Sequence, residues 1–212
     1  YLTCITASVD KRFRFAAPVY GCGFLGEEYA WTPTFEKMGP EKSGKWLQLW
    51  DPSVFLPQAT LPFLWVTGTN DEPYHFGQHQ KSYRLPKGPR TLCIRVRMPH
   101  SHPPGWECQE IYAFADNALK GGPALPSITG QGNDAANAWV TFDSPATVTE
   151  VQFNYTTDTG PWPKRNWNTV PANFDTQKKR AEAAIPPDTR AFYFNVIDDR
   201  AFLVSSEMVE TK

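Results

Sequence analysis

All four histidines of the 212-residue chain fall within one short stretch of sequence. His75 and His79 are four residues apart, and His100 and His102 form an H-x-H pair. Imidazole nitrogens at these spacings are ligands that zinc prefers. The carboxylate of Asp71 would add an oxygen ligand or orient one of the imidazoles. These residue types predict a site for zinc, or for another divalent metal, that activates water for hydrolysis.

Two buried strands are expected to position this cluster. The apolar runs at 61–67 and 91–98 are typical of parallel strands covered on both faces. The carboxyl ends of parallel strands meet at one edge of a sheet, where ligands bind. A helix beginning near Asp71 would follow the first run and carry His75 and His79 on one face with it. The H-x-H pair follows the second run, so we expect the four imidazoles to face a common cleft.

The rest of the sequence predicts an α/β region followed by an all-β region. The run at 13–20 is expected to be a further buried strand, and residues 23–60 an irregular insertion rich in Trp, Pro and Gly. Strands alternating with helices predict a parallel sheet with flanking helices over residues 1–126. Closely spaced strand-like runs separated by turns predict a small all-β sandwich domain over residues 127–212.

The two strands and the polar residues after them resemble the C-terminal portion of the α/β-hydrolase superfamily, in the dienelactone hydrolase and acetyl xylan esterase branch. The matching motifs are LPFLWVTGT followed by Asn70-Asp71, and TLCIRVRM followed by Pro99-His100-Ser101-His102. The resemblance covers residues 1–122. It implies that Asp71 is the triad acid and His102 the triad base, with His100 as the second choice for the base.

The same resemblance implies where the nucleophile of such an enzyme lies. A G-x-S-x-G elbow is expected immediately before the helix that precedes the strand at 13–20. The sequence opens inside that helix, at Tyr1. We therefore expect a truncated α/β-hydrolase sheet without its nucleophilic serine.

Three functions follow from these observations. The first is a metal-assisted hydrolase of carboxylic or phosphoric esters, in which the histidine cluster replaces the serine. The second is part of a Ser-His-Asp esterase for small-molecule esters, similar to carbohydrate esterases, whose serine lies on a separate N-terminal piece. The third is a non-catalytic carbohydrate-binding or interaction module, in which Trp162, Arg165 and Trp167 form a platform for a sugar.

Charge, hydropathy and cysteine placement restrict the expected partners. The formal net charge of −1 gives no electrostatic attraction to nucleic acid or to an anionic membrane. No apolar run approaches the ~20 residues that span a bilayer. The dispersed residues Cys4, Cys22, Cys93 and Cys108 are expected to be buried free thiols. An unpaired edge on the strand at 13–20 predicts a homodimer that covers this edge.

Overall fold

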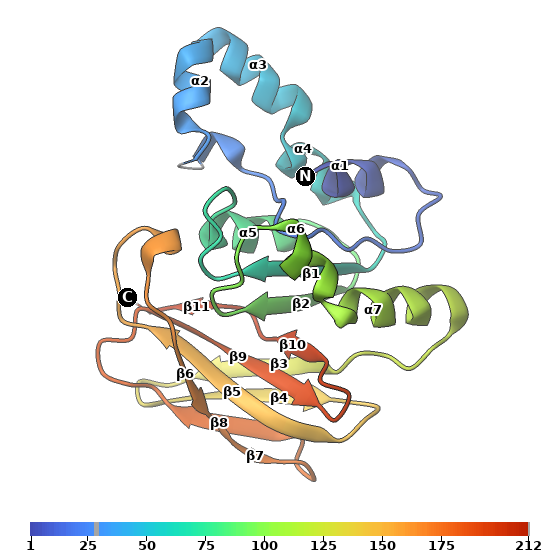
Figure 1. Cartoon of the computed structure of the whole chain (residues 1–212), viewed down its shortest axis with the longest axis vertical. Helices are drawn as coiled ribbons and strands as arrows, with labels where there is room; N and C mark the ends of the chain where they lie inside the picture. The colour runs from blue at the N-terminus through green and yellow to red at the C-terminus, as the bar shows by residue number, and fades with distance from the viewer. Residues whose placement is uncertain (28–29, 212) are drawn as a thin grey trace.

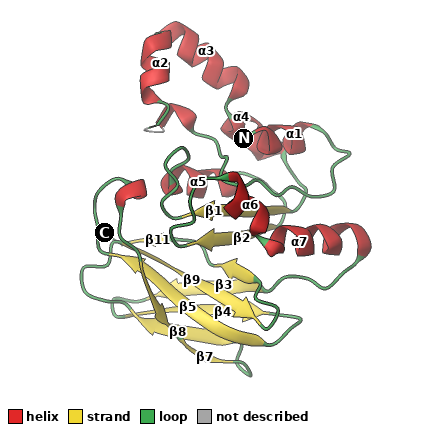
Figure 2. Cartoon of the chain, viewed as in Figure 1, coloured by secondary structure: helices red, strands yellow, loops and turns green. Residues whose placement is uncertain are grey.

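The structure is a computed structural model that describes residues 1–27 and 30–211. It contains a mixed sheet and a separate antiparallel sheet, with most helices gathered at one end of the molecule (Figure 1). Figure 2 shows the same division, with helices above and a strand-rich part below. The expected insertion at 23–60 includes positions 28 and 29, which lie outside the described residues.

The mixed sheet joins both regions of the sequence. Its parallel part consists of β1 (Phe63–Gly68) and β2 (Arg90–Arg95), and Trp65 lies opposite Leu92. Beyond β2 the strands are antiparallel, in the order β10 (Leu203–Ser205), β9 (Ala191–Asp198), β5 (Val148–Thr156) and β6 (Asn168–Pro171), while β11 (Val209–Glu210) also pairs with β9. One sheet thus contains strands from both sides of residue 126, and a domain boundary at that position stays a prediction.

The second sheet packs on the antiparallel part of the first. Its strands follow the order β3 (Ser127–Asn133), β4 (Asn137–Asp143), β8 (Arg180–Ala184) and β7 (Asn173–Asp175). Inward-facing residues of the two sheets, such as Val140, Phe153 and Phe194, meet in one apolar core. The strand-rich part is therefore a two-layer sandwich, as alternation of inward and outward residues along its strands predicts.

Helices cover both faces of the parallel strands. The helices are α1 (Leu2–Val9), α2 (Thr32–Met38), α3 (Pro40–Trp50), α4 (Pro52–Phe55), α5 (Phe76–Tyr83), α6 (His102–Glu107) and α7 (Gln109–Lys120), and the 3-10 turns are η1 (Leu25–Glu27), η2 (Leu56–Gln58) and η3 (Trp162–Lys164). Trp65 packs with Cys4 of α1 and Phe76 of α5. Its neighbour Val66 faces the other side and packs with Phe114 of α7. None of the described helices is long and apolar enough to cross a membrane.

The segment at 13–20 is extended but is not a regular strand. It makes isolated parallel bridges to β1 at Ala16 and Val19. Pro18 lies between them and has no N–H to donate, which explains the interruption. The homodimer expected at this edge stays a prediction. All four cysteines are buried, as predicted, and none of them forms a disulfide with a described residue.

Candidate functional site

Asp71 and His100 form a hydrogen-bonded pair just beyond the carboxyl ends of β1 and β2. Nδ1 of His100 lies 2.7 Å from Oδ2 of Asp71. Asp71 is 1% exposed, and its Oδ1 accepts the backbone N–H of Tyr74 at 2.7 Å. A buried carboxylate held at both oxygens fixes the orientation and tautomer of the imidazole. Nε2 of His100 is then the nitrogen that can accept a proton from a substrate or nucleophile.

The turn that carries Asp71 differs from the expected helix. We predicted a helix beginning near Asp71, whereas α5 begins at Phe76, and His75 before it has extended backbone with φ −62° and ψ 147°. The carboxylate of Asp71 accepts the N–H of Tyr74 within a turn, which replaces the first helical hydrogen bonds. The prediction was therefore wrong on this point, and Asp71, His75 and His79 do not share one helical face.

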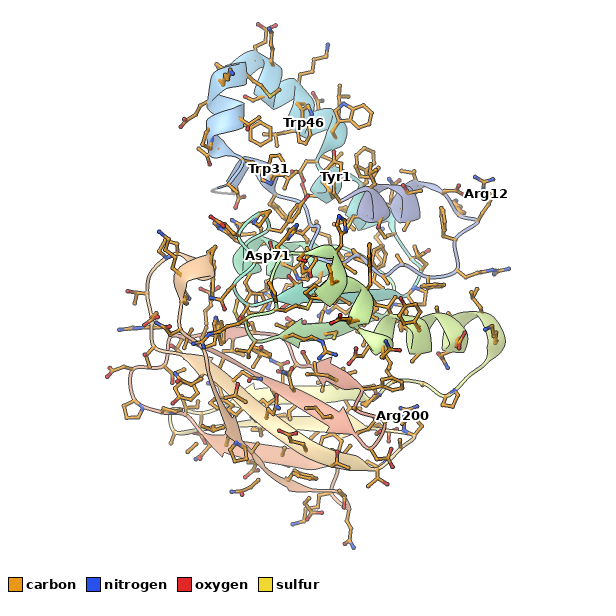
Figure 3. All side chains as sticks on the ribbon, in the orientation of Figure 1. Tyr1, Arg12, Trp31, Trp46, Asp71 and Arg200 are labelled. Carbon is orange, nitrogen blue, oxygen red and sulfur yellow. The ribbon has the colours of Figure 1, made fainter. Side chains whose placement is uncertain are left out.

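A cavity of about 400 Å³ lies beside His100. Aromatic rings form much of its wall: the ring centroid of Tyr20 lies 4.4 Å from that of His100, and the ring centroid of Tyr74 lies 5.9 Å from it. Trp106 and Tyr1 also line the cavity, and Tyr1 and Asp71 are labelled in Figure 3. An apolar cavity with one correctly held imidazole suits an organic substrate that has a polar reacting group.

The amino end of α1 approaches this cavity because residue 21 is glycine. A Cβ atom at Gly21 would lie 1.9 Å from the backbone nitrogen of Tyr1. The hydroxyl of Tyr1 donates to the carbonyl oxygen of Trp50 at 2.8 Å, which attaches this end of α1 to α3. The amino end of a helix carries a partial positive charge. The cavity wall formed by Tyr1 therefore favours negative charge.

Tyr20 connects the cavity wall to the loop that carries His100. Its hydroxyl donates to the carbonyl oxygens of Pro99 and Ser101, at 2.9 and 3.0 Å. Burial raises the pKa of Tyr20, so this hydroxyl keeps its proton at neutral pH. Tyr20 also has a φ of +62°, a value that few non-glycine residues adopt. Sequence analysis did not single out Tyr20, although its place at the end of an apolar run, directly before glycine, was a usable signal.

His79 lies in the core and not at the cavity. It is 0% exposed, and its ring packs edge-on against Trp65, with ring centroids 5.4 Å apart. Neither ring nitrogen has a hydrogen-bond partner among the described residues. Burial lowers the pKa of His79 to about 3, so the ring is neutral at physiological pH. His75, at the start of α5, is also buried.

The structure gives the predicted zinc site no support. His102 lies in the first turn of α6 and stacks on Trp106, with ring centroids 5.2 Å apart. Among the residues that the structure describes, no group of three or more His, Cys, Asp or Glu side chains could hold a metal ion. Of the two candidate bases, His100 is the one that contacts Asp71. A metal at this site stays an untested prediction.

The tryptophans expected to form a sugar platform pack instead between the two parts of the molecule. Trp162 and Trp167 both contact Phe76, with ring centroids 5.7 and 5.9 Å apart. The guanidinium carbon of Arg165 lies 3.5 Å from the ring centroid of Trp162, and Trp167 is 3% exposed. The side chain of Asn70 also donates to two carbonyl oxygens of this loop. Trp167 is therefore covered within the chain, and Trp162 is partly covered.

Comparison with known proteins gives only partial likenesses. No protein-family model matches the chain, and no curated protein matches it. An acetyl xylan esterase from Paenibacillus sp. R4 is similar over 56% of this chain and 42% of its own, with 16% identity and a TM-score of 0.49. The chain thus spans less than half the length of that esterase.

Two further solved structures are similar over 42% of this chain. One is a carbohydrate-binding module family 56 β-1,3-glucan binding domain, covered completely, with 15% identity and a TM-score of 0.28. The other is the pectate lyase PelI from Erwinia chrysanthemi, in complex with tetragalacturonic acid, of which 28% is covered, with 13% identity and a TM-score of 0.26. All three TM-scores lie below 0.5, so these likenesses assign neither a family nor an activity to the chain.

Proposed function

We propose that this chain supplies the base and the acid of a carboxylic ester hydrolase. His100 accepts the proton of the nucleophile, and Asp71 holds His100 and stabilises the imidazolium that forms. The observation that carries the proposal is the 2.7 Å contact between Nδ1 of His100 and Oδ2 of the buried Asp71, beside a cavity that His100 lines. The α/β-hydrolase resemblance implies Asp71 as the acid and His102 as the first choice for the base, and the proposal uses the second choice, His100.

The proposed position of the nucleophile is the amino end of α1. The resemblance implies a serine elbow directly before this helix. Tyr1, at the amino end of α1, lines the same cavity as His100. A serine hydroxyl is a weak nucleophile until a neighbouring base accepts its proton. A serine that precedes Tyr1 is therefore proposed to use His100 as its base.

The proposed reaction has two halves. The serine Oγ bonds to the ester carbonyl carbon while its proton moves to Nε2 of His100. The positive end of α1 stabilises the oxyanion of the tetrahedral intermediate. His100 then gives the proton to the leaving alcohol, and an acyl-serine remains. Water attacks the acyl-serine with its proton passing to His100, and that proton returns to the serine as the acid leaves.

The test compares two extended chains, one with Gly-Xaa-Ser and one with Gly-Xaa-Ala added directly before Tyr1. Hydrolysis of simple p-nitrophenyl esters is measured for both, with and without a chelator. We expect the serine-extended chain to be faster by at least about 10²-fold, because its serine is activated by His100 and a general base usually contributes about 10²–10⁴-fold. Equal rates in the two chains would contradict the proposed position of the nucleophile. Loss of activity with the chelator would favour the metal-assisted reaction instead.

A further inference from the structure

We propose that Tyr20 is a positioning residue, which holds His100 against Asp71. The inference rests on the proposed ester hydrolase function. The hydroxyl of Tyr20 donates to the carbonyl oxygens on the two sides of His100, at Pro99 and Ser101. The single O–H proton is shared between the two carbonyl oxygens, so one hydroxyl restrains the peptide unit before His100 and the one after Ser101.

The ring of Tyr20 restrains the same residue from the side. Its centroid lies 4.4 Å from that of the His100 imidazole. His100 and Ser101 are exposed, and an exposed loop opens more easily than a packed element. The buried ring of Tyr20, which packs with Val66 and Met98, supplies the fixed surface against which this loop lies.

The backbone of Tyr20 links this loop to the strand that leads to Asp71. Its N–H donates to the carbonyl oxygen of Val66 in β1 at 2.8 Å, and Asp71 follows the end of β1. Tyr20 thus contacts the strand before the acid with its backbone and the loop of the base with its side chain. The relative position of the two catalytic groups depends on both contacts.

The conformation of Tyr20 indicates that this placement is costly to the fold. The N–H of Gly21 donates to the carbonyl oxygen of Val19 at 2.7 Å, and φ of Tyr20 is +62°. Together they describe a γ-turn with positive φ at its central residue, the rarer and more strained kind. Such backbone conformations are energetically unfavourable and cluster at functional sites. Glycine at position 20 would relieve the strain, but the hydroxyl and ring contacts of Tyr20 with the His100 loop would be lost.

The experiment uses Tyr20→Phe, which keeps the ring and removes only the hydroxyl. The matched control is Tyr155→Phe, because Tyr155 packs at the sandwich core, away from the cavity. The first measurement is the NMR signal of the proton on Nδ1 of His100, whose exchange with water slows while Asp71 accepts it. We expect this proton to exchange at least about 10-fold faster in Tyr20→Phe, since a hydrogen bond opens more often when its loop is less restrained. In Tyr155→Phe its exchange should not change.

The second measurement is ester hydrolysis by the serine-extended chain. We expect kcat to fall about 10-fold in Tyr20→Phe with KM within about two-fold, because a displaced base slows proton transfer more than binding. Adding Tyr20→Phe to an Asp71→Asn chain should have no further effect on kcat, since the contact that Tyr20 protects is already lost. If Tyr20→Phe lowered kcat by the same factor with Asp71 present and in the Asp71→Asn chain, the inference would be overturned.

The two measurements separate this inference from the function on which it rests. An extended chain that hydrolyses no ester would contradict the proposed function, and the Nδ1 proton would still report on Tyr20. An unchanged proton exchange and kcat in Tyr20→Phe would overturn the positioning role alone. A Tyr20→Phe chain that fails to fold would also overturn it, because the hydroxyl would then serve the fold as a whole.

Discussion

The regions around His100 and His79 place the same kind of side chain in two different environments, although the two residues are close in sequence. His100 has a buried carboxylate on one ring nitrogen and a cavity beside it. His79 is enclosed by Trp65 and Tyr83, and no described residue makes a hydrogen bond to its ring. Protonation of His79 therefore carries the full penalty of charging a buried group.

This difference teaches that spacing along the sequence does not decide which histidine does chemistry. Both rings follow β1 or β2, and spacing alone made both of them candidate metal ligands. What distinguishes the two rings is a buried carboxylate hydrogen-bonded to the ring and a cavity beside it. His100 has both features, and His79 has neither among the described residues.

The largest expected effect is the loss of ester hydrolysis when the base is removed. In the serine-extended chain, His100→Ala should lower kcat by about 10²–10⁴-fold, the usual contribution of a general base. His79→Leu should leave kcat unchanged, because an apolar residue of similar size replaces a buried ring that lies away from the cavity. Steady-state kinetics on both variants checks this contrast. Similar losses in the two variants would remove the distinction between the two regions.

The next effect is a pH dependence of stability that comes from His79. Its pKa is about 3 in the folded chain and 6.5 in the absence of the fold. The unfolded chain therefore binds a proton below pH 6.5 that the folded chain does not bind until about pH 3, and stability falls as the pH falls through this window. The cost approaches about 1.4 kcal/mol per pH unit inside the window.

Urea unfolding of the native chain and of His79→Leu between pH 7 and pH 4 measures this dependence. The carboxylates titrate in both chains, so their contribution cancels in the difference. We expect His79→Leu to gain stability relative to the native chain at each step to lower pH. A difference that stays constant with pH would mean that His79 is not the buried neutral group described above.

Sequence analysis recovered the sheet better than the site. The runs at 61–67 and 91–98 were predicted to be parallel strands and became β1 and β2, because a continuous apolar run admits few other environments. The end of α7 at Gly121 follows a common sequence signal, because glycine readily adopts the φ of +70° found there. By contrast, β3 (SITGQGN) was missed because its apolar content is low. The space beside its glycines is occupied by the ring of Trp139 from the neighbouring strand, which the sequence of β3 alone does not indicate.

The site was harder to predict because it depends on contacts between distant residues. The sequence indicated Asp71 and two candidate bases, but only the fold shows that His100 is the one in contact with Asp71. The start of α5 was predicted too early in the sequence, because a turn in which Asp71 accepts the N–H of Tyr74 comes before the helix. Tyr20 and Gly21 contact residues 99–101 and Tyr1, and the glycine directly after the apolar run marked this position without indicating those contacts.

The third expected effect is a displacement of α1 from the cavity by Gly21→Ala. The added Cβ would lie 1.9 Å from the nitrogen of Tyr1, so the backbone must shift. We expect a loss of about 1–3 kcal/mol in the free energy of unfolding, as for other forced insertions into packed regions. Hydrolysis by the serine-extended chain should also fall. Gly160→Ala is the matched control, because a Cβ at Gly160 meets nothing within 4 Å. Equal stability of the two variants would contradict the close approach of Tyr1.

The smallest expected effect concerns a carboxylate that has partners but is only partly buried. Glu207 forms ion pairs with Arg84 and Arg90, and its side chain is 24% exposed. Glu207→Gln should lower the free energy of unfolding by about 1 kcal/mol or less, and high salt should shrink the difference, because solvent screens such pairs. Asp71→Asn should cost more, since Asp71 is 1% exposed and its charge faces His100 within the fold. Urea unfolding of both variants at low and high salt compares them directly. A larger loss of unfolding free energy in Glu207→Gln than in Asp71→Asn would contradict this expectation. Burial would then not explain the difference between Asp71 and a partly exposed ion pair.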